Sequence, residues 1–101
     1  MDDVSKSAVA HFLKNRDKWL RELANSRDLK HLSVRVGLHL AMRMTMRTQE
    51  AWPSIETISN DINASQRGVI GALDELTEEG FLGIERRRNK GNRYWLRFKW
   101  Q

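Results

Sequence analysis

Residues 52–96 read WPSIETISNDINASQRGVIGALDELTEEGFLGIERRRNKGNRYWL, and this stretch decides the fold of the 101-residue chain. Pro53 disfavours a helical conformation for the residue before it, and Ser54 is a good N-cap for the residues that follow. We therefore predict a helix over about residues 55–61. Its buried face is predicted by three isoleucines at helical spacing, namely Ile55, Ile58 and Ile62.

A second helix is predicted after a short turn at Asn63 and Ala64. Ser65 can cap this helix, whose apolar pattern runs over about residues 66–79. Gly80 stands where helices commonly end on a glycine in the left-handed conformation. The inward-facing stripe of the helix consists of Val69, Leu73 and Leu76.

A β-hairpin is predicted for the remainder of the stretch. Residues 81–85 form a strand-like run, and residues 89–92, Asn-Lys-Gly-Asn, supply a turn. The second strand is predicted over residues 93–99, because large side chains alternate there between two faces. One of these faces carries Tyr94, Leu96 and Phe98.

The N-terminal part of the chain is predicted to form a helix over residues 4–25, which Asp2 or Asp3 can cap. Its apolar stripe has two interpretations. It packs on its own domain as an extra helix, or it pairs with a second copy of the chain as a homodimer, which we favour. We therefore treat residues 1–32 as an N-terminal helical extension and residues 33–101 as the main domain. The stripe consists of Phe12, Leu13, Trp19, Leu20 and Leu23.

Residues 33–48 carry two conflicting signals. Large apolar side chains occupy alternate positions from Val34 to Met46, which is typical of a strand. The run is long for a strand, however, and its leucine, alanine, methionine and arginine residues favour helix. Because Ser33 is also a good N-cap, we predict a helix that is buried on much of its surface.

Helix, helix, tight turn, helix and hairpin follow one another in the order of a winged helix-turn-helix domain. Residues 54–58 read Ser-x-x-Thr-Ile, residues 65–73 read Ser-x-Arg-x-Val-x-x-Ala-Leu, and residues 80–82 read Gly-Phe-Leu. Residues 92–96 read Asn-x-Tyr-x-Leu. This pattern resembles winged helix-turn-helix domains of bacterial, plasmid and phage transcriptional regulators and replication initiators. The resemblance covers residues 33–98 and leaves the first helix unexplained.

The resemblance implies both a fold and a function. The implied fold class is α+β, mostly α: a winged helix-turn-helix with an N-terminal helical extension and a C-terminal β-hairpin wing. The implied function is DNA binding by a transcriptional regulator. Two alternatives stay open, a DNA-binding module of a plasmid or phage replication initiator and a winged-helix adaptor that binds another protein.

Basic residues gather at the C-terminal end of the chain, whose net charge is +5. Residues 84–101 hold seven Lys or Arg against Glu85 alone, whereas residues 50–83 hold seven acidic residues against Arg67 alone. This distribution predicts one basic surface and double-stranded DNA as the partner. The candidate DNA contacts in the wing are Arg86, Arg87, Arg88, Lys90 and Arg93.

The second helix of the motif is expected to enter the major groove at its N-terminus, where amide groups and a partial positive charge attract phosphate. Arg67 has an alternative partner in Asp61, with which it can form an ion pair. Arg43 and Arg47 can add phosphate contacts. The candidate DNA contacts on this helix are Ser65, Gln66 and Arg67.

Ile70 and Gly71 occupy positions where the resembling domains carry long polar residues that face the groove. In one interpretation, the small residue allows close backbone approach and Ile70 touches a thymine methyl group. In the other, base readout is poor and binding relies on phosphates and the wing. In either case the following acidic residues must point away from DNA: Asp74, Glu75, Glu78 and Glu79.

Several other classes of function are not expected. The chain has no cysteine, which excludes disulfides, thiolate metal sites and cysteine nucleophiles. Its three histidines show no ligand spacing, and no nucleophile–base pair is evident, so we predict no metal, no cofactor and no enzyme. No apolar run approaches a membrane span, and no signal-peptide pattern is present. We expect a cytoplasmic, nucleoid-associated protein.

Overall fold

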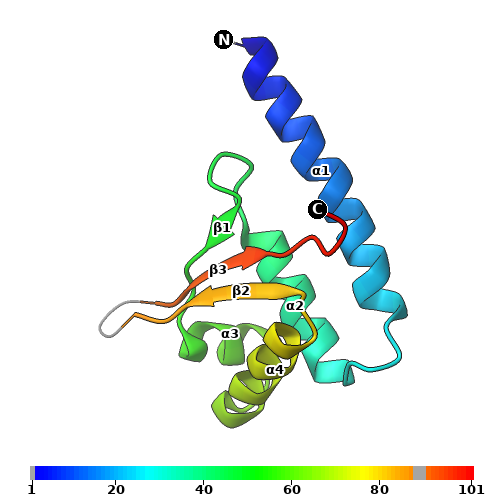
Figure 1. The fold of residues 1–101 in the computed structure, drawn as a ribbon. Coiled ribbons are helices and arrows are strands. Elements are labelled where there is room, and N and C mark those ends of the chain that lie inside the picture. The colour runs from blue at the N-terminus through cyan, green and yellow to red at the C-terminus, as the bar shows by residue number, and fades with distance from the viewer. Residues whose placement is uncertain (1, 88–90) are drawn as a thin grey trace.

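The computed structural model describes residues 2–87 and 91–101, with side chains from residue 6 onward. Its described part contains four helices and three short strands (Figure 1). This arrangement confirms the predicted class, which is α+β and mostly α. The helices are α1 (Asp2–Asn25), α2 (His31–Arg43), α3 (Ile55–Ile62) and α4 (Gln66–Glu78). The strands are β1 (Glu50–Ala51), β2 (Leu82–Glu85) and β3 (Arg93–Leu96).

The strands form one antiparallel sheet in the order β1-β3-β2. Strands β2 and β3 are the predicted hairpin, and their register pairs Leu82 with Leu96. Strand β1 lies along the other edge of β3 and pairs Glu50 with Trp95. The sequence did not predict β1, because two residues are too few to show any periodicity.

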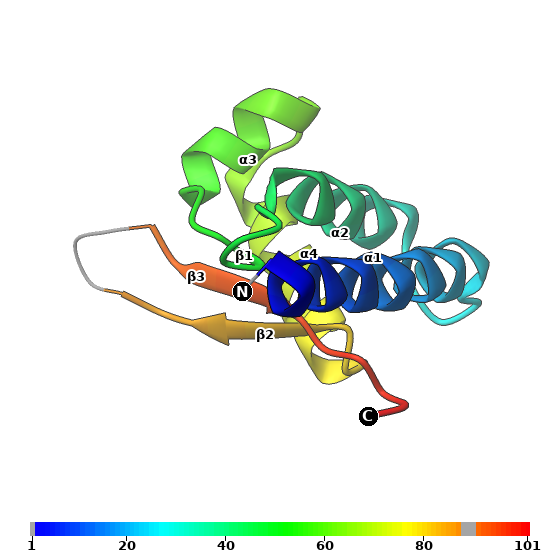
Figure 2. The same cartoon turned by 90° about the horizontal axis from the view of Figure 1, so that it is seen from above.

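One apolar core joins the helices to the sheet. Helix α1 runs beside α2, and α3 and α4 follow on the other side of α2 (Figures 1 and 2). The predicted apolar stripes of α3 and α4 face this core. Large side chains that are almost completely buried in it come from all four helices and both hairpin strands: Trp19, Leu23, Val36, Leu40, Ile58, Leu73, Leu76, Leu82 and Tyr94.

Helix α1 is fixed to the rest of the chain by Trp19. The indole Nε1–H of Trp19 donates a hydrogen bond of 2.9 Å to the carbonyl oxygen of Phe81, just before β2. The two rings meet edge to face, with centroids 5.8 Å apart. Because Phe12, Trp19 and Leu23 are buried in this way, most of the α1 stripe packs within its own chain.

The C-terminal residues leave the sheet and return to α1. We predicted a strand to residue 99, but β3 ends at Leu96. Phe98 lies 6.3 Å from Phe12 between ring centroids, and Trp100 stacks on Phe98 at 5.5 Å. The indole Nε1–H of Trp100 also donates to Asn15 Oδ1 at 2.8 Å. These aromatic contacts hold the tail against α1.

The helix predicted over residues 33–48 is wrong at both ends. Helix α2 begins at His31 with Lys30 as its N-cap, and the hydroxyl of Ser33 bonds to another helix instead of capping this one. It ends at Arg43, because the next residue is extended and the chain then turns. In that turn, Thr45 Oγ1 accepts a hydrogen bond of 3.0 Å from the backbone of Thr48, and such local bonds compete with helix.

Candidate nucleic-acid interface

The two helices α3 and α4 are held at a fixed angle by a tight turn. Ser54 caps α3, and its hydroxyl oxygen accepts a hydrogen bond of 3.0 Å from the backbone N–H of Thr57. Asn63 adopts the left-handed conformation, with φ 56°, and ends the helix. The guanidinium of Arg35 on α2 donates to the carbonyl oxygen of Ile62 at 2.7 Å. These contacts fix the direction in which α4 starts.

Both predicted ends of α4 are confirmed. Ser65 caps the helix, and its hydroxyl oxygen accepts a hydrogen bond of 3.0 Å from the backbone of Gly68. At the other end, Gly80 has φ +78°, and the backbone N–H of Phe81 donates to the carbonyl oxygen of Leu76 at 2.9 Å. This is the hydrogen bond of a Schellman motif, which requires a left-handed residue at the position that Gly80 occupies.

The N-terminus of α4 is open to solvent. Ser65, Gln66 and Arg67 are all exposed there. The first backbone N–H groups of a helix have no intrahelical partner, and only that of Gly68 is engaged by the Ser65 cap. The amides of Gln66 and Arg67 therefore remain available to an anion.

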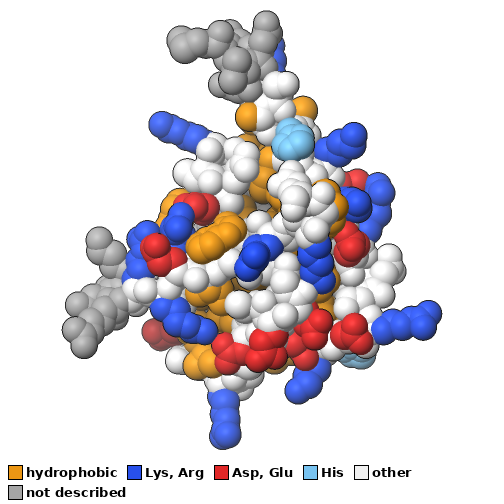
Figure 3. All heavy atoms as spheres, viewed as in Figure 1, with side chains coloured by type: hydrophobic (Ala, Val, Ile, Leu, Met, Phe, Trp, Pro, Cys, Tyr) orange, Lys and Arg blue, Asp and Glu red, His pale blue; other side chains and the backbone are white. Residues whose placement is uncertain are grey.

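Acidic side chains gather on the C-terminal half of α4. Asp74, Glu78 and Glu79 are exposed. Figure 3 shows a band of acidic side chains low on this face of the molecule, in the region where α4 ends. Because phosphates repel carboxylates, this end of the helix is unsuited to close contact with a nucleic-acid backbone.

The described arginines of the wing are paired with the chain's own carboxylates. Arg86 contacts Asp74 of α4 at 3.1 Å, and Arg87 contacts Glu85 at 3.1 Å. Arg93 is partly buried, bonds to Glu50 of β1 and lies over the ring of Trp95 at 4.7 Å. The sequence identified these arginines but not their acidic partners, of which Asp74 and Glu50 come from other elements of the fold. Two candidate contacts, Arg88 and Lys90, lie outside the described residues.

Asn92 connects the two strands of the wing near the point where β3 begins. Its Oδ1 accepts from the backbone N–H of Arg87 at 3.2 Å, and its Nδ2 donates to the hydroxyl of Tyr94 at 3.2 Å. Tyr94 is completely buried, and this burial raises the pKa of its phenol, so the group stays neutral. Through these two bonds, Asn92 connects Arg87, which follows β2, to the buried Tyr94 of β3.

Comparison with known proteins identifies this arrangement. The model of a helix-turn-helix domain family matches residues 27–82, which include α2, α3 and α4. The chain belongs to the helix-turn-helix domain family. With the β2–β3 hairpin directly after α4, it is a winged helix-turn-helix domain, as the sequence predicted.

The chain is also similar to solved structures. The structure of reduced HlyU from Vibrio cholerae N16961 is similar, with a TM-score of 0.48 and 21% sequence identity. The similar region covers 98% of this chain and 84% of HlyU. No curated protein matches the sequence of this chain.

Glu75 links α4 to the start of α2. Its Oε1 accepts a hydrogen bond of 2.6 Å from the Ser33 hydroxyl and one of 2.9 Å from the backbone N–H of Lys30. These two bonds lower the pKa of the Glu75 carboxyl. Glu75 therefore caps a neighbouring helix and points away from the open face of α4, a role that sequence reasoning missed.

Asp61 near the end of α3 pairs with α2. Its Oδ2 lies 3.1 Å from Arg43 Nη1 and 3.5 Å from His39 Nε2. The alternative pairing of Asp61 with Arg67 is therefore not found. Arg43, which we expected to add a phosphate contact, forms the ion pair with Asp61 instead. Burial lowers the pKa of His39, an effect that Asp61 opposes and Arg43 reinforces.

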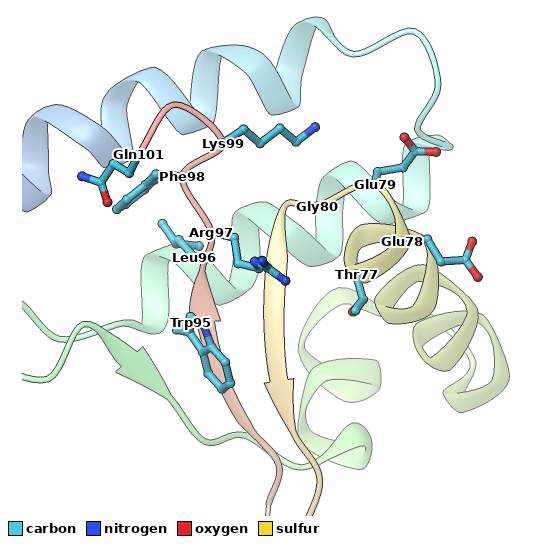
Figure 4. Close-up of a pocket in the computed structure, with 10 residues that line it drawn as sticks. All are labelled: Thr77, Glu78, Glu79, Gly80, Trp95, Leu96, Arg97, Phe98, Lys99 and Gln101. Carbon is cyan, nitrogen blue, oxygen red and sulfur yellow. The ribbon is translucent and has the colours of Figure 1, made fainter.

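A surface hollow of about 660 Å³ lies at the opposite end of α4 from Ser65 (Figure 4). Glu78 and Glu79 come from the end of α4, whereas Arg97 and Lys99 come from the chain after β3. The hollow is therefore lined by acidic side chains from α4 and basic side chains from the C-terminal tail. It is separate from the open N-terminus of α4.

In residues 2–87 and 91–101, no three His, Cys, Asp or Glu side chains are grouped so that they could hold a metal ion. Within the same ranges, no helix is both long and apolar enough to cross a membrane.

Proposed function

We propose that this protein binds double-stranded DNA as a transcriptional regulator, with the N-terminus of α4 in the major groove and the wing on the phosphate backbone or in the minor groove. The distribution of charge along α4 carries this proposal. Arg67 stands at the open N-terminal end, and the exposed acids Asp74, Glu78 and Glu79 occupy the other half. The helix can therefore approach DNA favourably by one end.

The chemistry of that end suits both phosphates and bases. The N–H groups of Gln66 and Arg67 can donate to a phosphate, and the helix dipole adds to the attraction. The side chains of the same residues can reach base edges, since arginine pairs with guanine and glutamine with adenine. Ser65, whose hydroxyl is engaged as the cap, positions this turn and can also donate its hydroxyl hydrogen to a phosphate.

The wing arginines can exchange their present partners for phosphates. The side chains of Arg86 and Asp74 are 61% and 53% exposed, and such exposed ion pairs contribute only about 0–1 kcal/mol. Replacing a carboxylate by a phosphate therefore costs little. The ion pair of Arg87 with Glu85 is also exposed and can be exchanged in the same way. Arg88 and Lys90 complete the proposed set of wing contacts. The more enclosed Arg93 would act mainly by holding the wing to β1.

The proposal is tested by fluorescence anisotropy with a mixed-sequence DNA duplex at several salt concentrations. We expect salt-dependent binding, because each phosphate contact releases counterions and adds about 0.9 to the slope of log K against log salt. Arg67→Ala, and the double variant Arg87→Ala with Arg88→Ala, should weaken binding and reduce that slope. The control is Arg21→Ala, which removes an equal charge from α1, where Arg21 pairs with Asp17.

An unchanged affinity and slope in the wing variant would show that the wing does not touch DNA. Equal losses in Arg21→Ala and Arg67→Ala would show that only the net charge matters. Absence of binding even at low salt would contradict the proposal as a whole.

A second candidate function, binding to a protein partner, is favoured by one observation. Ile70 is 45% exposed on α4, where a DNA-reading helix commonly carries polar side chains. Under this alternative, Ile70→Ala would abolish the protein interaction, and the wild-type protein would not retain DNA.

We also propose that the protein binds DNA as a homodimer through α1. Leu13 is 38% exposed on this helix, although Phe12, Trp19 and Leu23 are buried in their own chain. A second copy would therefore use the part of the stripe that the fold leaves open. The stoichiometry of the same titration tests this: two chains per duplex would support a dimer, and one chain would contradict it.

A further inference from the structure

The open face of α4 carries one large apolar side chain, Ile70, among its described residues. Ile70 is 45% exposed and does not belong to the apolar core or to the partly buried side chains that pack against it. A β-branched residue is also a weaker helix former than the leucine or methionine that could stand there. Neither packing nor helix propensity therefore explains an isoleucine at this position.

The neighbouring Gly71 is also unexplained by the fold. A Cβ atom built on Gly71 would meet nothing within 4 Å, so no side chain of the protein requires a glycine there. Gly68 is different, because a Cβ on it would lie 3.0 Å from Leu32 Cδ2. Glycine weakens the interior of a helix, yet Gly71 has no compensating contact inside the protein. Two adjacent positions thus point to a contact with something outside the chain.

The residues around Ile70 along α4 are compatible with a contact between Ile70 and the edge of a DNA base. Arg67 lies one helical turn before it and Asp74 one turn after it, and Asp74 is held by Arg86 of the wing. Along α4, Ile70 therefore lies between Arg67 and the Asp74–Arg86 ion pair, and both arginines can bind phosphates. The apolar group that the major groove offers at a base edge is the 5-methyl group of thymine.

We infer that Ile70 is a specificity-determining residue that recognises thymine through its 5-methyl group, and that Gly71 lets the helix backbone approach the groove. This inference rests on the proposed function, because it requires α4 to enter the major groove. On this helix turn, Arg67 supplies charge and can pair with a base, whereas Ile70 recognises thymine by its methyl group.

The inference is tested by selecting preferred sites from a pool of duplexes with a randomised core, using the wild-type protein. Each thymine of the selected site is then replaced in turn by deoxyuridine, which removes only the methyl group. At one position we expect about a fourfold loss of affinity for the wild type, which is the effect of one buried methyl group. Ile70→Ala should bind both duplexes about equally. The control is Leu38→Ala, which truncates an apolar side chain that is 44% exposed on α2.

The outcomes separate this inference from the proposed function. Retained DNA binding with no effect of deoxyuridine at any position would overturn the role of Ile70 and leave DNA binding intact. A deoxyuridine effect that persists unchanged in Ile70→Ala would assign the methyl contact to another residue and also overturn it. If no duplex is retained at low salt, the inference and the proposed function fail together.

Discussion

Single residues on α4 separate what the fold needs from what DNA recognition needs, and Gly71 is the sharpest example. Gly71→Ala should stabilise the protein by about 1 kcal/mol, because alanine is the better helix former and its Cβ has free space. The same methyl group should weaken binding to the selected DNA site, since it would stand between the helix backbone and the groove. Urea unfolding measures the stability, and anisotropy measures the affinity.

The matched variant for Gly71→Ala is Gly68→Ala. Its added Cβ would lie 3.0 Å from Leu32 Cδ2 and 3.1 Å from the cap oxygen of Ser65, so the gain in helix propensity should be lost to crowding. If Gly71→Ala raises stability and leaves DNA affinity unchanged, the close approach of the backbone at Gly71 is wrong.

At this scale the sequence predicts side-chain types better than their partners. Ser65 was predicted as an N-cap from its position alone, because a cap needs only local geometry. The partners of Arg86 and Arg93 are Asp74 and Glu50, which lie 12 and 43 residues away in the chain. Such pairs depend on how distant elements meet, which no local pattern encodes.

Pairs of elements are joined by polar contacts, and the junction of α4 with α2 has a predictable pH dependence. Glu75 accepts hydrogen bonds from Ser33 and Lys30, which lower the pKa of its carboxyl below the usual 4.5. A carboxyl with a lowered pKa in the folded state adds stability above its unfolded pKa, and that stability is lost as the pH falls through the folded value. Wild type should therefore exceed Glu75→Gln in thermal stability near neutral pH, and the difference should shrink as the pH falls below the unfolded pKa of about 4.3 and through the lower folded pKa.

The control for this prediction is Glu78→Gln, three residues further along α4, for which the described residues show no hydrogen bond to the carboxylate. Its effect near neutral pH should be smaller than that of Glu75→Gln, because no hydrogen bond to α2 is lost. A constant difference between wild type and Glu75→Gln down to pH 2 would show that the contact with α2 does not depend on the charge of Glu75.

The same junction shows why α2 was hard to predict. Ser33 has the residue type of an N-cap, but its hydroxyl is used by a carboxylate that comes from α4, 42 residues later. Lys30 begins the helix without a side-chain cap of its own, because Glu75 accepts its backbone N–H. Helix α4 has the same length, but it has a regular apolar stripe and a cap of its own in Ser65, and it was predicted closely.

For the whole molecule, the main question is how α1 relates to the winged helix-turn-helix domain. The family match begins at residue 27 and therefore excludes α1. The aromatic residues Trp19 and Phe12 nevertheless lie in the same core as α2 and α4. Periodicity predicted a helix with an apolar stripe, but a stripe does not specify which surface will cover it. Only the position of Phe81 and of the C-terminal tail decides that question.

This view of the whole chain predicts that α1 unfolds together with the rest of the domain. Trp19→Phe removes the hydrogen bond to the Phe81 carbonyl, which keeps its bond from the backbone of Arg97, and leaves a small cavity. We expect a loss of about 2 kcal/mol. The unfolding curves from far-UV circular dichroism and tryptophan fluorescence should still coincide, because one core holds all the helices. Trp100→Phe, which removes a half-buried indole bonded to Asn15, should cost less. A circular-dichroism transition for Trp19→Phe that splits in two would contradict the single core and show that α1 folds as a separate extension.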